Sequence, residues 1–134
     1  MAIQIFDFKD PGKRLRKNNV FFQYSSEESF TGEYWLDGKK IYTKTLVAPM
    51  RDFATGNVRH GVTNMGNYRC FDFNNSFWNI NGNFYHLGRW ESANAFLCPG
   101  AIANTGYMNL MVGSSWASGT TLAYITIRYT KTTD

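Results

Sequence analysis

The side chains of this sequence that could do chemistry are mainly aromatic rings set among amides, and such a mixture suits a sugar. Phe, Trp and Tyr make up 17% of its 134 residues. An aromatic ring offers a flat apolar face to a sugar ring, while Asn, Ser and Asp supply hydrogen bonds to its hydroxyl groups. The middle of the chain is dense in both kinds, at Asn74, Asn75, Trp78, Asn81, Asn83, Tyr85, Trp90, Asn94, Asn104, Tyr107 and Trp116.

Four of these aromatic residues are the predicted ligand contacts: Trp116, Trp90, Tyr85 and Trp78. Trp116 ranks first because it is the single large residue in the Ser- and Gly-rich loop 113–121, and Trp90 ranks second. A Trp or Tyr in a β-domain belongs more often to the core or to a subunit interface, and Trp35 is assigned there.

Residues suited to catalysis are scarce, so we predict that the protein is not an enzyme. His60 is expected to be structural, and His86 alternates with Phe84 and is expected to face solvent. The chain has no G-x-S-x-G nucleophile elbow, although a triad assembled from distant residues stays open. A glycosidase needs two carboxylates beside its bond, and the middle of the chain offers Asp72 and Glu91, which would have to converge.

The two cysteines, Cys70 and Cys98, both have an apolar neighbour. Free Cys packs like a small hydrophobic residue, so two buried thiols are expected, and a disulfide between them stays open. Neither Cys has a second ligand at metal spacing, so the sequence predicts neither a metal site nor a cofactor.

Charge and hydropathy exclude further classes of partner. The net charge is +4, and much of the excess lies in one short run, Lys13, Arg14, Arg16 and Lys17, which is expected to be a solvated connector. The remaining body is close to neutral, which argues against a nucleic-acid surface. No apolar run is long enough to span a membrane, and the N-terminal residues do not form a secretory signal.

These side chains must be positioned by β-strands, and the clearest local pattern is a hairpin over residues 31–47. Asp37-Gly38 separates two aromatic and β-branched runs, which predicts a two-residue type I′ turn. Asn81-Gly82 predicts a second hairpin of the same kind between strands at 77–80 and 83–87. Ala48-Pro49 is expected to end the strand before it, because Pro cannot donate to a sheet ladder.

The rest of the chain also favours short strands. Further strands are expected at 2–8 (or an arm), 20–24, 58–62, 68–73, 94–98, 107–112 and 122–130, with a turn at Thr55-Gly56-Asn57 within residues 52–57 and a break at Pro99-Gly100. No window shows convincing helical periodicity. Eight to ten short strands at this spacing predict an all-β fold, an antiparallel, jelly-roll-like β-sandwich. We expect residues 1–30 to form an arm or connector and residues 31–134 to form the sandwich domain.

Three segments of the sequence resemble a pattern found in bacteriophage tail fibres and baseplate receptor-binding proteins. The first two contain Tyr24-Ser25-Ser26-Glu27-Glu28, Gly32, Trp35-Leu36-Asp37-Gly38-Lys39, Ile41-Tyr42, Lys44-Thr45 and then Val58-Arg59-His60-Gly61-Val62. The third is the terminal stretch 123–134, AYITIRYTKTTD. The match covers residues 24–62 and 122–134 and departs at Lys40, where the family often has Pro; residues 67–121 show no match.

The resemblance implies a β-sandwich head at the end of a fibre, built as a homotrimer that binds carbohydrate on the host cell surface. It also implies a place in the virion, in a tail assembled in the host cytoplasm with other tail proteins. Physical arguments point the same way, because so many aromatic residues favour burial between subunits. Three weak sites on one fibre would also bind more tightly together through effective concentration.

Two alternatives stay open beside this interpretation. One is a structural virion connector or decoration protein with the same fold and no ligand, and the other is a polysaccharide-degrading tailspike fragment. The sequence identifies neither the host bacterium nor the sugar. It also leaves open whether residues 1–30 dock on a longer fibre or pack on the head.

Overall fold

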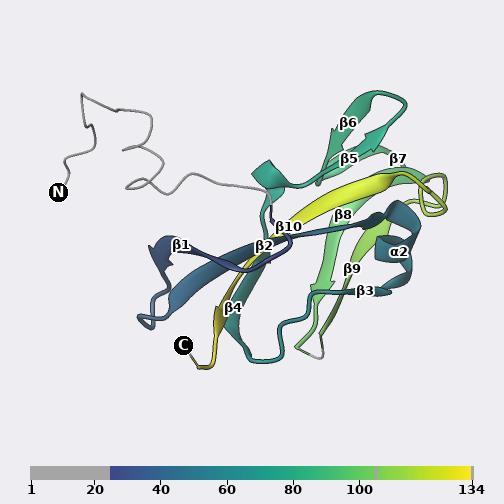
Figure 1. Ribbon diagram of the computed structural model, residues 1–134. Helices are drawn as coiled ribbons and strands as arrows, with labels where there is room; N and C mark the ends of the chain where they lie inside the picture. Colours follow the sequence, from purple (N-terminus) through teal and green to yellow (C-terminus); the bar gives the residue numbers. More distant parts are fainter. Residues whose placement is uncertain (1–24, 105, 134) are drawn as a thin grey trace, which may run out of the picture.

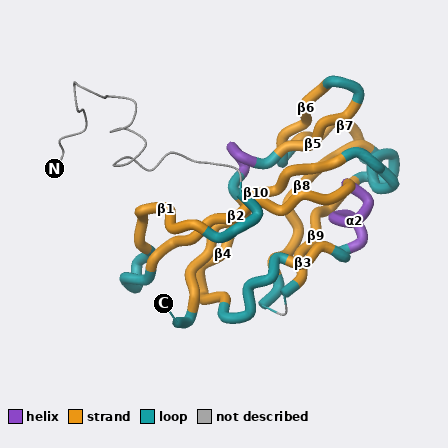
Figure 2. Tube along the Cα trace, viewed as in Figure 1, coloured by secondary structure: helices purple, strands orange, loops and turns teal. Residues whose placement is uncertain are grey.

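A computed structural model describes residues 25–104 and 106–133, and antiparallel β-strands make up most of this part of the chain (Figures 1 and 2). The all-β prediction is confirmed. The strands are β1 (Ser29–Tyr34), β2 (Lys40–Pro49), β3 (Val58–Arg59), β4 (Met65–Phe71), β5 (Phe77–Ile80), β6 (Asn83–His86), β7 (Arg89–Ser92), β8 (Ala95–Ile102), β9 (Tyr107–Val112) and β10 (Leu122–Lys131). The expected elements at 2–8 and 20–24 and the basic run at 13–17 lie outside the described residues.

The strands form two sheets. The larger has the order β1-β2-β10-β5-β6, and β4 pairs with β10 as well. β10 pairs with β2 from Leu122 to Tyr129, while its other side meets β5 near its start and β4 near its end. The smaller sheet has the order β3-β9-β8-β7. In Figure 1 the β5–β6 hairpin and β7 lie at one end of the molecule, and β1 lies at the other.

The first predicted hairpin is present at the expected residues, but its turn is of a different type from the one predicted. Trp35 and Lys39 pair around a three-residue loop, with Trp35 N donating to Lys39 O at 2.8 Å and Gly38 N donating to Trp35 O at 2.9 Å. Gly38 is left-handed at φ 85°, but Asp37 does not share its positive φ. Asp37 instead accepts the Lys39 N–H with Oδ1 at 3.0 Å. This is the geometry of a type I turn followed by a glycine bulge, which the Asp side chain supports.

The second hairpin has the predicted turn. Ile80 pairs with Asn83 across the two-residue loop, in which Asn81 has φ 51° and Gly82 has φ 81°. Both central residues are thus left-handed, as a type I′ turn requires. The strand predicted at 122–130 is also confirmed as β10, and β2 ends at Pro49 as expected.

The structure differs from the local predictions in three places. A turn follows Thr55 as predicted, but Met50–Thr55 before it form the helix α2, which was not predicted; it is too short to show helical periodicity and buries Met50 and Phe53. β7 was not predicted. β8 runs through Pro99, where a break was expected. Because β7 pairs only as far as Leu97, one side of β8 is unpaired at Pro99, and there a missing N–H is tolerated.

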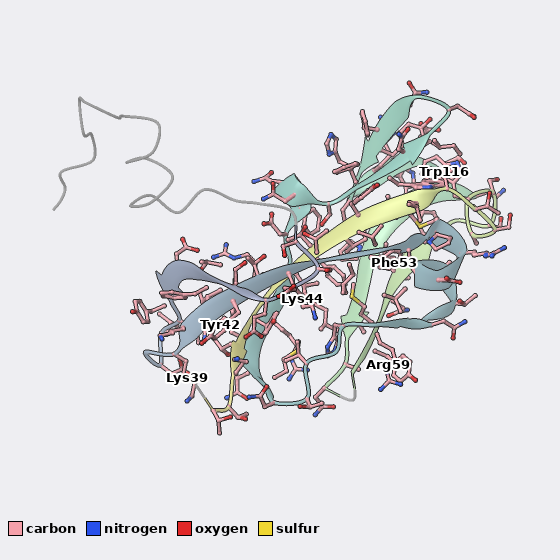
Figure 3. All side chains as sticks on the ribbon, viewed as in Figure 1. Lys39, Tyr42, Lys44, Phe53, Arg59 and Trp116 are labelled. Carbon is pink, nitrogen blue, oxygen red and sulfur yellow. The ribbon has the colours of Figure 1, made fainter. Side chains whose placement is uncertain are left out.

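One hydrophobic core draws on both sheets. The larger sheet contributes Leu46, Ile125 and Ile127 and the smaller contributes Leu97, Met108 and Leu110, all buried. The helix α2 closes this core at one end of the sheets with Phe53, which is labelled in Figure 3.

Residues before the expected domain boundary at 31 pack on the larger sheet. β1 begins at Ser29, and Ser25 O accepts the Thr45 N–H at 2.7 Å. Glu28 accepts hydrogen bonds from Tyr129 Oη and from Lys131 Nζ, both at 2.6 Å. Burial, and then the bond to Glu28, raise the pKa of Tyr129 far above its ordinary value. The described part of the predicted arm is therefore attached to β10.

Candidate functional site

Three of the four predicted contact residues meet in one aromatic cluster, Trp78, Tyr85 and Trp116. Trp116 stacks on Tyr85 with ring centroids 5.0 Å apart, and both rings meet Trp78 edge-on, at 5.8 Å and 6.3 Å. Cross-strand pairing sets Tyr85 of β6 opposite Trp78 of β5. Figure 3 places Trp116 in the loop beside this hairpin. The sequence therefore selected residues that do come together.

Burial decides which of these rings a ligand could reach. Trp78 is wholly buried, and its Nε1 donates to Thr121 Oγ1 at 2.7 Å, so it is a core residue and offers no face to a ligand. Tyr85 and Trp116 are half-buried against it. The Arg89 guanidinium lies over the Tyr85 ring, 5.0 Å from its centroid. With Trp116 and Arg89 both on Tyr85, little of this ring is left for a sugar.

Trp90 is the open ring of the set. Its side chain is 62% exposed, and it stacks on Phe96 of β8 with centroids 4.9 Å apart and an angle of 18° between the planes. The two residues are cross-strand partners, so Phe96 supports one face of the indole and holds its orientation. A flat, supported and exposed Trp is the surface on which a sugar ring can stack.

The strand that carries Trp90 is an edge strand. β7 pairs with β8 alone, and all four of its residues are exposed. Its register with β8 shifts between Trp90 and Ser92, which leaves Glu91 as the residue of a bulge. Bulges at edges re-aim side chains and keep a strand from pairing further. A ligand lying along this edge can touch side chains that point to either side of the strand.

Charge beside Trp90 comes from its two neighbours. Glu91 Oε2 accepts from Arg89 Nε at 3.1 Å and from Arg89 Nη2 at 2.5 Å. Arg89 is thus held between a carboxylate and the Tyr85 ring, and it links the aromatic cluster to the β7 edge. We call Arg89, Trp90, Glu91 and Phe96 the β7 site.

The ranking of the candidates by sequence is therefore corrected. Trp90, placed second, is the most accessible ring, while Trp116, placed first, packs inward. Sequence reasoning did not select Arg89, Glu91 or Phe96 as ligand contacts. The signal that could have found them is the hairpin pattern itself, because Arg-Trp-Glu-Ser and Ala-Phe-Leu flank a two-residue turn, Ala93-Asn94.

The residues considered for catalysis have structural partners. His60 is fully buried; its Nδ1 accepts from Val62 N at 3.1 Å and its Nε2 lies 2.6 Å from Ala103 O. Burial is the main cause that lowers the pKa of His60, and Lys44 and Arg69 lower it further, against the Ala103 bond. The expected structural role of His60 fits these contacts, and His86 is exposed as expected.

The two carboxylates considered for catalysis have different hydrogen-bond partners. Asp72 Oδ2 accepts from Asn75 Nδ2 at 2.9 Å, while Glu91 is paired with Arg89. Each carboxylate is thus engaged with a different neighbour, and neither contact has the form of a shared acid–base pair.

The two cysteine thiols and Trp35 are all half-buried. Cys70 and Cys98 are free and half-buried, more exposed than predicted. Cys70 Sγ lies 3.1 Å from Tyr68 Oη, and burial together with this contact raises the pKa of Tyr68 to about 12. Trp35 stacks on the same Tyr68 ring at 4.1 Å and is half-buried.

The described residues contain no group of three or more His, Cys, Asp or Glu side chains that could hold a metal ion. Within the same part of the chain, no helix has the length and apolar character needed to cross a membrane.

Comparison with known proteins adds no name to this site. No protein-family model matches the chain, and searches of curated proteins and of solved structures found no match.

Proposed function

We propose that this protein is the receptor-binding head of a bacteriophage tail fibre and binds carbohydrate on the host cell surface as a homotrimer. The observation that carries the proposal is Trp90, an indole 62% exposed and supported from behind by Phe96 on the free edge of a sheet. Exposing the apolar surface of a large aromatic ring to water is unfavourable. A sugar ring stacked on it would cover that surface. The resemblance of residues 24–62 and 122–134 to tail proteins supplies the phage assignment.

The proposed architecture is a jelly-roll-like β-sandwich. Support comes from the two antiparallel sheets that share one core and from the return of β10 between β2 and β5. In such a sandwich the outer faces of the sheets are available to partners.

The proposed trimer has support from the outer face of the larger sheet. Val47 of β2 and Leu122 of β10 are 46% and 45% exposed. Val47 is paired with Tyr124, and Leu122 with Pro49, so these four residues form adjacent rows on one face, opposite the buried Leu46 and Ala123. An antiparallel sheet that faces water normally carries polar residues on that side. An apolar face here therefore favours contact between subunits.

The main experiment measures binding to a glycan array with purified protein displayed in several copies. Trp90→Ala should reduce binding at least about tenfold, because one stacked aromatic contributes on the order of 1–2 kcal/mol. Tyr34→Ala is the matched control, since Tyr34 is 60% exposed on β1 at the far edge of the other sheet. Equal loss in both variants would argue against a site at β7.

Sedimentation tests the assembly. The wild type should sediment as a trimer at micromolar concentration, and Val47→Lys with Leu122→Lys should sediment as a monomer, because the change buries two charges in the seam. A wild-type monomer would contradict the trimer. A trimer that binds no glycan would instead favour a structural connector or decoration protein. Release of reducing ends from surface polysaccharide would favour a tailspike fragment.

A further inference from the structure

The Arg89–Glu91 pair leaves one donor and one acceptor of the β7 site without a partner in the pair. Both Arg89 nitrogens that contact Glu91, Nε and Nη2, meet the same oxygen, Oε2. Within the described residues, Glu91 Oε1 and Arg89 Nη1 have no hydrogen-bond partner. The side chains are 37% and 48% exposed, and the two residues flank Trp90 on β7, so a ligand lying along this edge can meet them.

This arrangement matches adjacent hydroxyl groups better than it matches an anion. A sugar hydroxyl both donates and accepts, so two neighbouring hydroxyls can donate to Oε1 and accept from Nη1. A carboxylate can only accept. To bind Arg89 through two bonds on its Nε–Nη2 edge, a ligand carboxylate would have to displace Glu91 and would then lie beside that second negative charge.

From this geometry we infer that the glycan bound at the β7 site is a neutral sugar, and that Glu91 determines this selectivity by neutralising Arg89. The inference rests on the proposed carbohydrate-binding function and adds the class of ligand. Trp90 supplies the stacking surface, and the Arg89–Glu91 pair reads adjacent hydroxyls along the edge of β7. The Tyr85 ring beneath the guanidinium keeps Arg89 in place for both contacts.

The experiment uses pairs of immobilised oligosaccharides that differ only at C6: glucose and glucuronate, galactose and galacturonate, mannose and mannuronate. The wild type should bind the neutral member of its preferred pair about threefold to tenfold better than the uronate, since a second carboxylate near Glu91 is repelled. Glu91→Gln should abolish or reverse this ratio. Raising the salt concentration should reduce the wild-type preference, because the repulsion is screened.

Glu33→Gln is the matched control. Glu33 is also the exposed carboxylate of an ion pair, with Arg128, but it lies on β1. The Glu33→Gln substitution changes the net charge of the protein by the same amount as Glu91→Gln. It should leave the ratio of neutral-sugar to uronate binding unchanged. Near-ultraviolet circular dichroism checks that both variants keep the wild-type fold.

The outcomes separate the inference from the proposed function. A neutral preference lost in Glu91→Gln and kept in Glu33→Gln supports the inference. Binding that prefers the uronate, or a ratio that Glu91→Gln leaves unchanged, overturns the inference while carbohydrate binding stands. Absence of binding to both members of every pair, and to the glycan array, overturns both.

Discussion

The two sheets differ in the regularity of their central pairing, although the β1–β2 and β4–β10 pairings of the larger sheet also contain a register shift. In the larger sheet, β2 and β10 pair without a register shift over eight consecutive residue pairs, from Leu122–Pro49 to Tyr129–Tyr42. In the smaller sheet, both the β7–β8 and β8–β9 pairings contain a shift. The larger sheet presents an unbroken row of buried side chains on its inner face, whereas the smaller ends in an edge strand whose residues are all exposed.

One tryptophan from each sheet illustrates the difference between the sheets. Trp78, in the larger sheet, is fully buried with its indole nitrogen bonded, and Trp90, in the smaller sheet, is mostly exposed. Regular pairing places a ring between the sheets, where it stabilises the fold. An irregular edge leaves a ring outside, where it is available to a partner. Under the proposed function, the larger sheet mainly supplies stability and the edge of the smaller sheet supplies recognition.

The largest effect is expected from Trp78→Ala. The change removes a fully buried ring that touches Tyr85 and Trp116 and leaves a cavity, so it should lower the free energy of unfolding by about 3–5 kcal/mol. Urea unfolding followed by far-ultraviolet circular dichroism measures this. A loss below about 1 kcal/mol would show that the ring is not part of the core, contrary to its complete burial.

Gly100→Ala tests the irregular sheet. A Cβ at this position would lie 2.5 Å from Asn109 O, a backbone atom, and 2.9 Å from Asn109 Oδ1. The strands would have to separate, at a cost of about 1–3 kcal/mol in the free energy of unfolding. Adding Asn109→Ala removes the side-chain overlap but not the backbone overlap, so the double variant should stay destabilised. Recovery in the double variant would show that only the side chain is in the way.

Sequence patterns predicted the regular parts of the fold because local signals there agree with the tertiary structure. β10 alternates along its length, and Asn81-Gly82 can adopt a type I′ turn without strain. The patterns failed where tertiary context decides. Pro99 predicts a break, but it lies within β8 because the side of β8 away from β9 is unpaired there, and α2 is too short to show helical periodicity.

Sequence composition identified aromatic residues that lie together, but not which of them is exposed. The density of Trp, Tyr and Asn pointed to the middle of the chain, where Trp78, Tyr85 and Trp116 do meet. Which ring faces solvent depends on packing between segments, such as Trp116 folding back onto Tyr85 and Phe96 supporting Trp90. The Ser- and Gly-rich composition of the loop around Trp116 does not predict that the Trp116 ring packs inward.

A smaller, pH-dependent effect is expected from His60, which packs at the β3 end of the smaller sheet. Its pKa is lowered in the folded state, mainly by burial, so below about pH 6.5 the unfolded chain binds a proton that the folded chain does not. The free energy of unfolding should therefore fall as the pH decreases from 7 to 5.5. His60→Gln should flatten this slope whatever its effect at pH 7, and His86→Gln, at an exposed position, should leave it intact.

An unchanged slope in His60→Gln would mean that another group causes the pH dependence. It would also remove one reason for treating the smaller sheet's interior as a packed core like that of the larger sheet. The comparison of the two sheets would then rest only on the burial of Trp78 and the exposure of Trp90.

The smallest effect on stability is expected from Trp90→Ala, and it sharpens the comparison most. The indole loses only its stacking on Phe96, so the free energy of unfolding should fall by less than about 1 kcal/mol. Glycan binding should nevertheless be lost. Trp78→Phe provides the contrast, because it should lower stability more than Trp90→Ala does and leave binding near the wild-type level. If Trp90→Ala unfolded the protein as Trp78→Ala does, the exposed ring would belong to the scaffold, and the division of roles between the two sheets would be wrong.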